Sequence, residues 1–250
     1  MNVTLKKCLN CGADVEMNFC PRCGQTIHIH RYTVKHILHD FFHSFTHVDS
    51  GILFLIKELT IRPGTVAREY IEGKRKKYFS PMQYLLLGIA IVTFLSVNLQ
   101  LGTGLIGNYE VKGESLQNFT EQFLPFFYKS YNIFQFLTIP LTAFYSWLFF
   151  RKSGFNYSEN MILNTFLIGQ RHLLYLIFIP FLYYFPENSR DIITVHMIIW
   201  SFYFIYAYIQ FFRPKKRIWS ALKTIFIVWL FIMSQGLVMI LIFIFIFFNN

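Results

Sequence analysis

Residues 62–84 read RPGTVAREYIEGKRKKYFSPMQY, and at this stretch the chain changes from a polar segment to a mostly apolar one. Four consecutive cations stand in its centre, and we call them the basic collar: Lys74, Arg75, Lys76 and Lys77. An aromatic pair and Pro81 follow, and then a long apolar run begins. Aromatic residues beside cations are typical of a membrane interface, and proline suits the first turn of a helix. We therefore expect this stretch to join a soluble head to a membrane domain.

The composition indicates a membrane protein. Of the 250 residues, 54% are hydrophobic and only 14% are charged, whereas soluble domains carry about 25% charged residues. The net charge of +10 is expected for cytoplasmic loops and for contact with anionic lipid head groups, so we do not expect a nucleic-acid partner. The first apolar run begins only near residue 81, so no signal peptide is expected.

Two matched cysteine motifs lie near the start of the chain, Cys8-Leu-Asn-Cys11-Gly12 and Cys20-Pro-Arg-Cys23-Gly24. Each motif can direct two thiolates at one ion, and the glycine permits the positive φ of the turn. Four thiolates form a closed tetrahedral site, which favours a structural Zn²⁺ ion, with iron as the alternative metal. We expect residues 1–30 to form a zinc-ribbon head, which either binds a cytosolic protein partner or only holds the terminus in shape.

Residues 31–80 carry helical periodicity but no run long enough to cross a bilayer. We expect amphipathic helices over about 37–45 and 52–59, and a third short helix from Thr65 to about Lys74. Asp49 or Ser50 is the expected cap of the second helix. These helices lie either on the membrane surface or against the helical bundle. The basic collar that ends the segment is expected to set topology and to contact anionic lipid phosphates.

A row of histidines recurs at spacings of three, four and four and would line one face of the first of these helices. Its members are His36, His39, His43 and His47. They could form a second metal site or a pH switch, with Asp40 as the best acidic candidate beside them. The alternative interpretation is an interfacial polar face, which we favour because no acidic ligand is firmly fixed there.

The motifs of this first third resemble one known family. They are the two CxxCG motifs, then HVDSG at residues 47–51, RPG at 62–64 and YIEGKRKKYFSP at 70–81. Together they resemble the DUF3667 family of bacterial membrane proteins over roughly residues 8–85. The resemblance implies a multi-span membrane architecture. It implies no catalytic residues, because the function of that family is undefined.

Residues 81–250 are expected to form an all-α integral membrane domain. Five candidate spans have about the length that a bilayer requires: 81–101, 131–150, 159–185, 192–212 and 221–248. The segments that would lie on the side of the head, 1–80, 151–158 and 213–223, hold 12, 2 and 5 lysines and arginines. The opposite side holds three, Lys112, Lys129 and Arg190. This asymmetry predicts a cytoplasmic N-terminus and an external C-terminus in a bacterial inner membrane.

Arg171 is the one cation near the middle of a candidate span. Helical spacing places Asn164 and Tyr175 on the same stripe, and an intramembrane cation normally faces protein or a water-filled cavity. The stripe could bind an anionic solute or a lipid head group. Alternatively, the five hydrogen-bond donors of Arg171 could simply anchor neighbouring helices.

The sequence shows no nucleotide-binding loop, no nucleophile elbow and no HExxH motif, and it indicates no paired carboxylates near a cleft. An enzyme is therefore the least supported class. Within that class, the alternative left open is a lipid enzyme that acts on the cytosolic face. The sequence favours a non-enzymatic scaffold or adaptor with a structural zinc head. The alternative is a small-solute or lipid transporter built around Arg171, expected to work as an oligomer.

Overall fold

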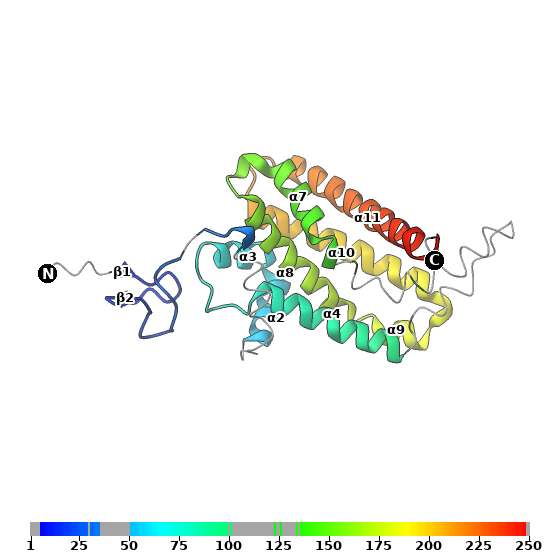
Figure 1. Cartoon of the computed structure of the whole chain (residues 1–250), viewed down its shortest axis with the longest axis horizontal. Helices are drawn as coiled ribbons and strands as arrows, with labels where there is room; N and C mark the ends of the chain where they lie inside the picture. Colours follow the sequence, from blue (N-terminus) through cyan, green and yellow to red (C-terminus); the bar gives the residue numbers. More distant parts are fainter. Residues whose placement is uncertain are drawn as a thin grey trace.

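The computed structural model describes residues 6–29, 31–35, 51–99, 101, 123, 126, 134 and 136–248. The described chain is mostly helical, and a small head of two short strands lies at one end of a bundle of helices (Figure 1). The elements are β1 (Lys6–Lys7), β2 (Asp14–Val15), α2 (Ile52–Ile61), α3 (Pro63–Ile71), α4 (Pro81–Asn98), α7 (Ile139–Phe150), η1 (Arg151–Ser153), α8 (Tyr157–Tyr175), α9 (Ile179–Tyr184), η2 (Pro186–Asn188), α10 (Ser189–Phe212) and α11 (Arg217–Phe248).

Helix α8 is the centre of the bundle. Every residue from Ile162 to His172 is buried, and α8 packs against α4, α7 and α3. A capping box begins the helix, because the Asn156 side chain accepts from the Glu159 N–H while the Glu159 side chain accepts from the Asn156 N–H. The bundle is therefore organised around a helix that is covered by protein on all sides.

In the part of the chain that the structure describes, three helices are long and apolar enough to cross a membrane: Pro81–Asn98, Pro186–Phe212 and Arg217–Phe245. These three helices support the assignment to the membrane class, but the described residues do not show the five spans that the sequence predicts. The expected run over 159–185 is divided, because α8 ends at Tyr175 and the six-residue α9 begins at Ile179. Polar residues inside α8 lower its mean hydropathy, and they are tolerated because protein surrounds them. Helix α7, in the second expected run, has only 12 described residues.

The two helices before the collar rest on the bundle. Leu55 and Leu59 of α2 and Val66 of α3 are fully buried. Helix α3 lies so close to α10 that a Cβ added at Gly64 would be 2.1 Å from the carbonyl oxygen of Ala207. Both helices thus pack on the bundle, while Leu53, Phe54 and Ile61 of α2 stay exposed.

The boundaries of these helices differ slightly from the expected ones. Helix α3 begins at Pro63, two residues before the expected start, and ends at Ile71. The N-cap residue of α2 is Gly51, whereas the expected caps Asp49 and Ser50 lie outside the described residues, as does the expected helix over 37–45.

Candidate functional site

The four cysteines converge in the head. All four Sγ atoms lie within 4.8 Å of one another, and the Cys8–Cys23 and Cys11–Cys20 pairs are 3.6 and 3.5 Å apart. A tetrahedral ion with metal–sulfur bonds of about 2.3 Å needs sulfurs about 3.8 Å apart. The cluster therefore fits one metal ion, and four protein ligands would leave no open position for substrate.

The two halves of this centre have the same backbone geometry. In the first, the Gly12 N–H donates to the carbonyl of Cys8 at 2.8 Å; in the second, the Gly24 N–H donates to the carbonyl of Cys20 at 2.8 Å. Gly12 and Gly24 adopt φ values of 75° and 69°, a region that favours glycine. The glycine after each CxxC is therefore explained by the turn that it completes.

The environment acts in opposite directions on two of the thiols. A hydrogen bond from the backbone of Ala13 favours the Cys11 thiolate, but burial and hydrogen bonds with the other three sulfurs raise the pKa of Cys11 to about 11. Burial opposes a thiolate at Cys23, but hydrogen bonds from the backbone N–H of Gln25 and the side chain of Asn10, together with neighbouring sulfurs, lower its pKa to about 7. Thiolates are the form that binds metal.

The head docks on the loop that carries the basic collar. Gln25 is 3% exposed, and its Nε2 donates to the carbonyl of Gly73 at 2.7 Å. Its Oε1 accepts from the backbone N–H groups of Arg75 and Lys76, at 3.1 and 3.2 Å. Asn10 accepts from the N–H of Lys77 at 3.0 Å. The sequence does not predict this contact, since its only signal is that Gln25 directly follows the second CxxCG motif.

Glu69 of α3 holds the collar in place. Its carboxylate pairs with Lys74 at 3.2 Å and with Lys77 at 3.0 Å, and it accepts a hydrogen bond from the hydroxyl of Tyr78. Burial alone would raise the pKa of Glu69, but the hydrogen bonds from Tyr78 and the two lysines lower it to about 2. Two of the four collar cations therefore contact a carboxylate of the protein itself.

The other two collar cations, Arg75 and Lys76, have different surroundings. The guanidinium of Arg75 lies 4.0 Å from the ring centroid of Tyr32, and that ring stacks on Tyr70. The side chain of Lys76 is exposed. The expected contact of the collar with anionic lipid stays a prediction, with Lys76 as its most accessible cation.

A second set of hydrogen bonds joins the segment directly after the head to the start of α8. Arg31 makes two hydrogen bonds to the carboxylate of Glu159, at 2.6 and 2.8 Å, and a third to the carbonyl of Gly154 at 2.6 Å. The Glu159 side chain is only 4% exposed, whereas that of Arg31 is 60% exposed. Asn156 also donates to the carbonyl of Tyr32 at 3.1 Å. The segment after the metal centre is thus tied to the first turn of the central helix.

The expected stripe of Arg171, Asn164 and Tyr175 is divided between two clusters of contacts. Arg171 is 5% exposed, and its guanidinium lies 4.8 Å from the ring centroid of Trp200. Tyr175 packs edge-on against His196, with the ring centroids 5.1 Å apart. Asn164 instead donates to Ser146 at 3.1 Å and accepts from Tyr208 at 2.9 Å. Arg171 and Tyr175 therefore contact Trp200 and His196 of α10, which the sequence did not indicate. Asn164 has other partners, Ser146 and Tyr208.

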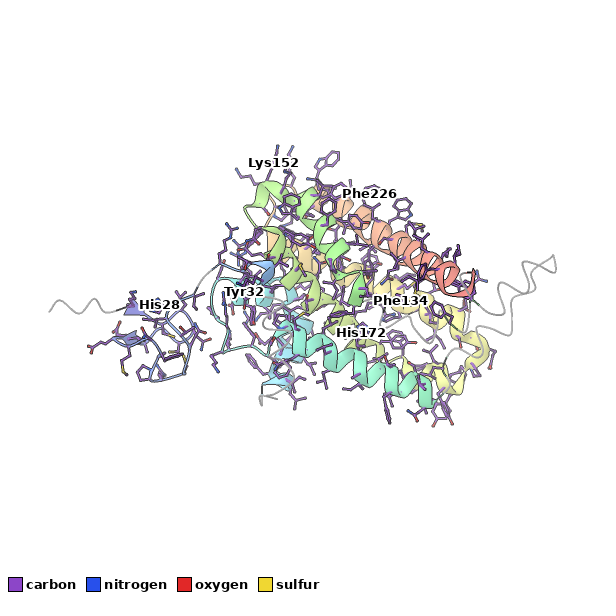
Figure 2. The ribbon with its side chains drawn as sticks, in the orientation of Figure 1. His28, Tyr32, Phe134, Lys152, His172 and Phe226 are labelled. Atoms are coloured by element: carbon purple, nitrogen blue, oxygen red, sulfur yellow. The ribbon has the colours of Figure 1, made fainter. Side chains whose placement is uncertain are left out.

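Two buried histidines lie near Arg171, and in the described part of the chain each has a ring nitrogen without a hydrogen-bond partner. His172 and His196 are 3% and 4% exposed, and Figure 2 shows His172 inside the bundle. Nδ1 of His172 lies 2.8 Å from the carbonyl oxygen of Ile168. Within the described part of the chain, Nε2 of each histidine has no hydrogen-bond partner. The four expected histidines of the first amphipathic helix, at positions 36, 39, 43 and 47, lie outside the described residues.

Comparison with known proteins gives one match. The family model for a protein of unknown function, DUF3667, matches residues 49–93, in agreement with the resemblance of the motifs. The matched segment contains α2, α3, the basic collar and most of α4, but not the four-cysteine head. No curated protein and no solved structure matches the chain.

Proposed function

We propose that this protein is a non-enzymatic scaffold or adaptor of a bacterial inner membrane, with a structural zinc site in a cytoplasmic head. The N-terminus would face the cytoplasm and the C-terminus the outside. In this arrangement α7 and α8, with their flanking residues, supply the second and third of five crossings, in addition to the three long apolar helices. The distribution of lysines and arginines supports this orientation.

One observation carries the proposal: the closed four-sulfur centre belongs to a head that is docked on the collar. A centre with four protein ligands stabilises a fold and offers no site for a reaction. Zinc is the preferred occupant, because four thiolates in tetrahedral arrangement suit it and so small a head has little other core. The docked head would present a fixed surface to a cytosolic partner.

That surface has an identifiable apolar part. Met17 and Phe19 are 64% and 63% exposed on the head. We therefore expect that the double substitution Met17→Ser and Phe19→Ser in the full chain abolishes crosslinking to a defined set of proteins. Val34→Ser, at another exposed apolar side chain, serves as the control. An unchanged set of partners, with the metal content intact, would remove the adaptor role from the head.

A second candidate function is a small-solute or lipid transporter with a site around Arg171. It is favoured by the buried guanidinium over Trp200 and by the unused Nε2 atoms of His172 and His196. In this case Arg171→Leu should abolish lipid retention or uptake while expression stays normal, and Arg171→Lys should keep part of it. Full retention or uptake in the leucine variant would place any transport site elsewhere.

A further inference from the structure

The charges at the head-side end of the bundle fall into two groups with different surroundings. Three of the four collar cations lie against protein, because Lys74 and Lys77 pair with Glu69 and Arg75 lies over Tyr32, whereas Lys76 is exposed. The second group, which we call the basic rim, lies at the ends of α7, α10 and α11. Its members are Arg151, Lys152, Arg213, Lys215, Lys216 and Arg217, and all six are exposed.

The rim side chains have no acidic partner. Among the described residues, no ion pair includes any of the six. The sequence explains this, because residues 192–250 contain no aspartate or glutamate. Their positive charge is therefore directed outward, whereas that of Lys74 and Lys77 is partly neutralised within the protein.

Contacts between α7 and α11 bring the two parts of the rim to one end of the bundle. Lys223 donates to the carbonyl of Phe149 at 3.2 Å, and the Phe149 and Phe226 rings are 5.4 Å apart. The loop after α7 thus lies near the first turns of α11. Figure 2 shows Lys152 pointing away from the bundle at this end.

Exposed apolar groups accompany the cations. Ile218 and Trp219, in the first turn of α11, are 78% and 62% exposed, directly after Arg217. The guanidinium of Arg151 lies 5.8 Å from the ring centroid of Trp147. Tryptophan beside cations at the end of an apolar helix is the composition of a membrane interface, where rings enter the head-group layer and cations meet phosphates.

We propose that the basic rim is the principal binding surface of this protein for anionic phospholipid head groups. Charge complementarity selects the occupant: the rim offers six outward cations beside tryptophan, at the end of helices that are apolar enough to span the bilayer. The collar contributes less, since its lysines Lys74 and Lys77 already contact Glu69.

The test uses the full chain purified in detergent and titrated with phosphatidylglycerol or phosphatidylcholine, with bound lipids counted by native mass spectrometry. The rim variant carries Lys215→Gln, Lys216→Gln and Arg217→Gln. The matched control removes the same charge from exposed positions of the head by Lys6→Gln, Lys7→Gln and Arg22→Gln. Monodispersity and helical circular dichroism verify that both variants are folded.

A cation near an anionic membrane surface is worth about fivefold in affinity. We therefore expect a roughly tenfold or greater loss of phosphatidylglycerol affinity in the rim variant. The head variant should bind like the wild type, and phosphatidylcholine binding should not change. An equal loss in both variants would show that only total charge matters, and undiminished binding in the rim variant would assign the contact to other residues. Either result overturns the proposal.

Discussion

Replacing Gln25 by alanine should release the head from the collar without removing the metal. The side chain makes three hydrogen bonds to the backbone of Gly73, Arg75 and Lys76. At about 1 kcal/mol for each bond, its loss should weaken docking by roughly 2 to 3 kcal/mol. The metal centre should persist, because Cys20 donates to the backbone carbonyl of Gln25, which alanine retains.

Hydrogen exchange at the amides of Arg75 and Lys76 measures this effect, since both donate to the Gln25 side chain. If these amides exchange through undocking, a change of 2 to 3 kcal/mol corresponds to exchange about 30- to 150-fold faster. Gln25→Glu should weaken docking as well, because the oxygen that replaces Nε2 cannot donate and would face the carbonyl oxygen of Gly73, although the other oxygen still accepts from both amides. Thr26→Ala is the control on the neighbouring residue. Unchanged exchange at both amides in the alanine variant, with full metal content, would refute the assignment of docking to Gln25.

Three further outcomes are expected. Gly64→Ala should destabilise the bundle by roughly 3 kcal/mol in thermal unfolding, because its Cβ would meet the backbone of α10, whereas Gly236→Ala, with nothing within 4 Å, should not. Chelation or Cys20→Ser should abolish amide protection in the head and at the collar amides that dock on it, those of Arg75, Lys76 and Lys77, but not in the helices; a parallel loss of helical circular dichroism would contradict the modular head. The pKa of Glu69 is lowered to about 2, so the stabilisation of the collar by its carboxylate is complete above about pH 4.5 and is lost as pH falls toward 2. The collar amides should therefore lose protection over that range, relative to an unfolded chain at the same pH. This pH-dependent loss should be absent in Glu69→Gln.

The sequence by itself determined the features that depend on local spacing and composition. Two CxxCG motifs specify a four-sulfur cluster, because each knuckle closes within five residues and positions its own pair of sulfurs. The long apolar runs that became α4, α10 and α11 were visible for the same reason, since the length needed to cross a bilayer can be counted along the chain. The motifs around the collar also pointed to the family whose model matches residues 49–93.

Only the tertiary structure decided what these elements touch. Charge and position suggested that the collar contacts lipid, which stays a prediction; the structure adds that Lys74 and Lys77 also pair with Glu69 of α3. The stripe of Arg171 and Asn164 was inferred from helical spacing, yet neighbouring helices give the two residues different partners. The place of Gln25 directly after the second CxxCG motif does not reveal its partners, because a buried glutamine is defined by the backbone that it meets, and here that backbone lies about fifty residues along the chain.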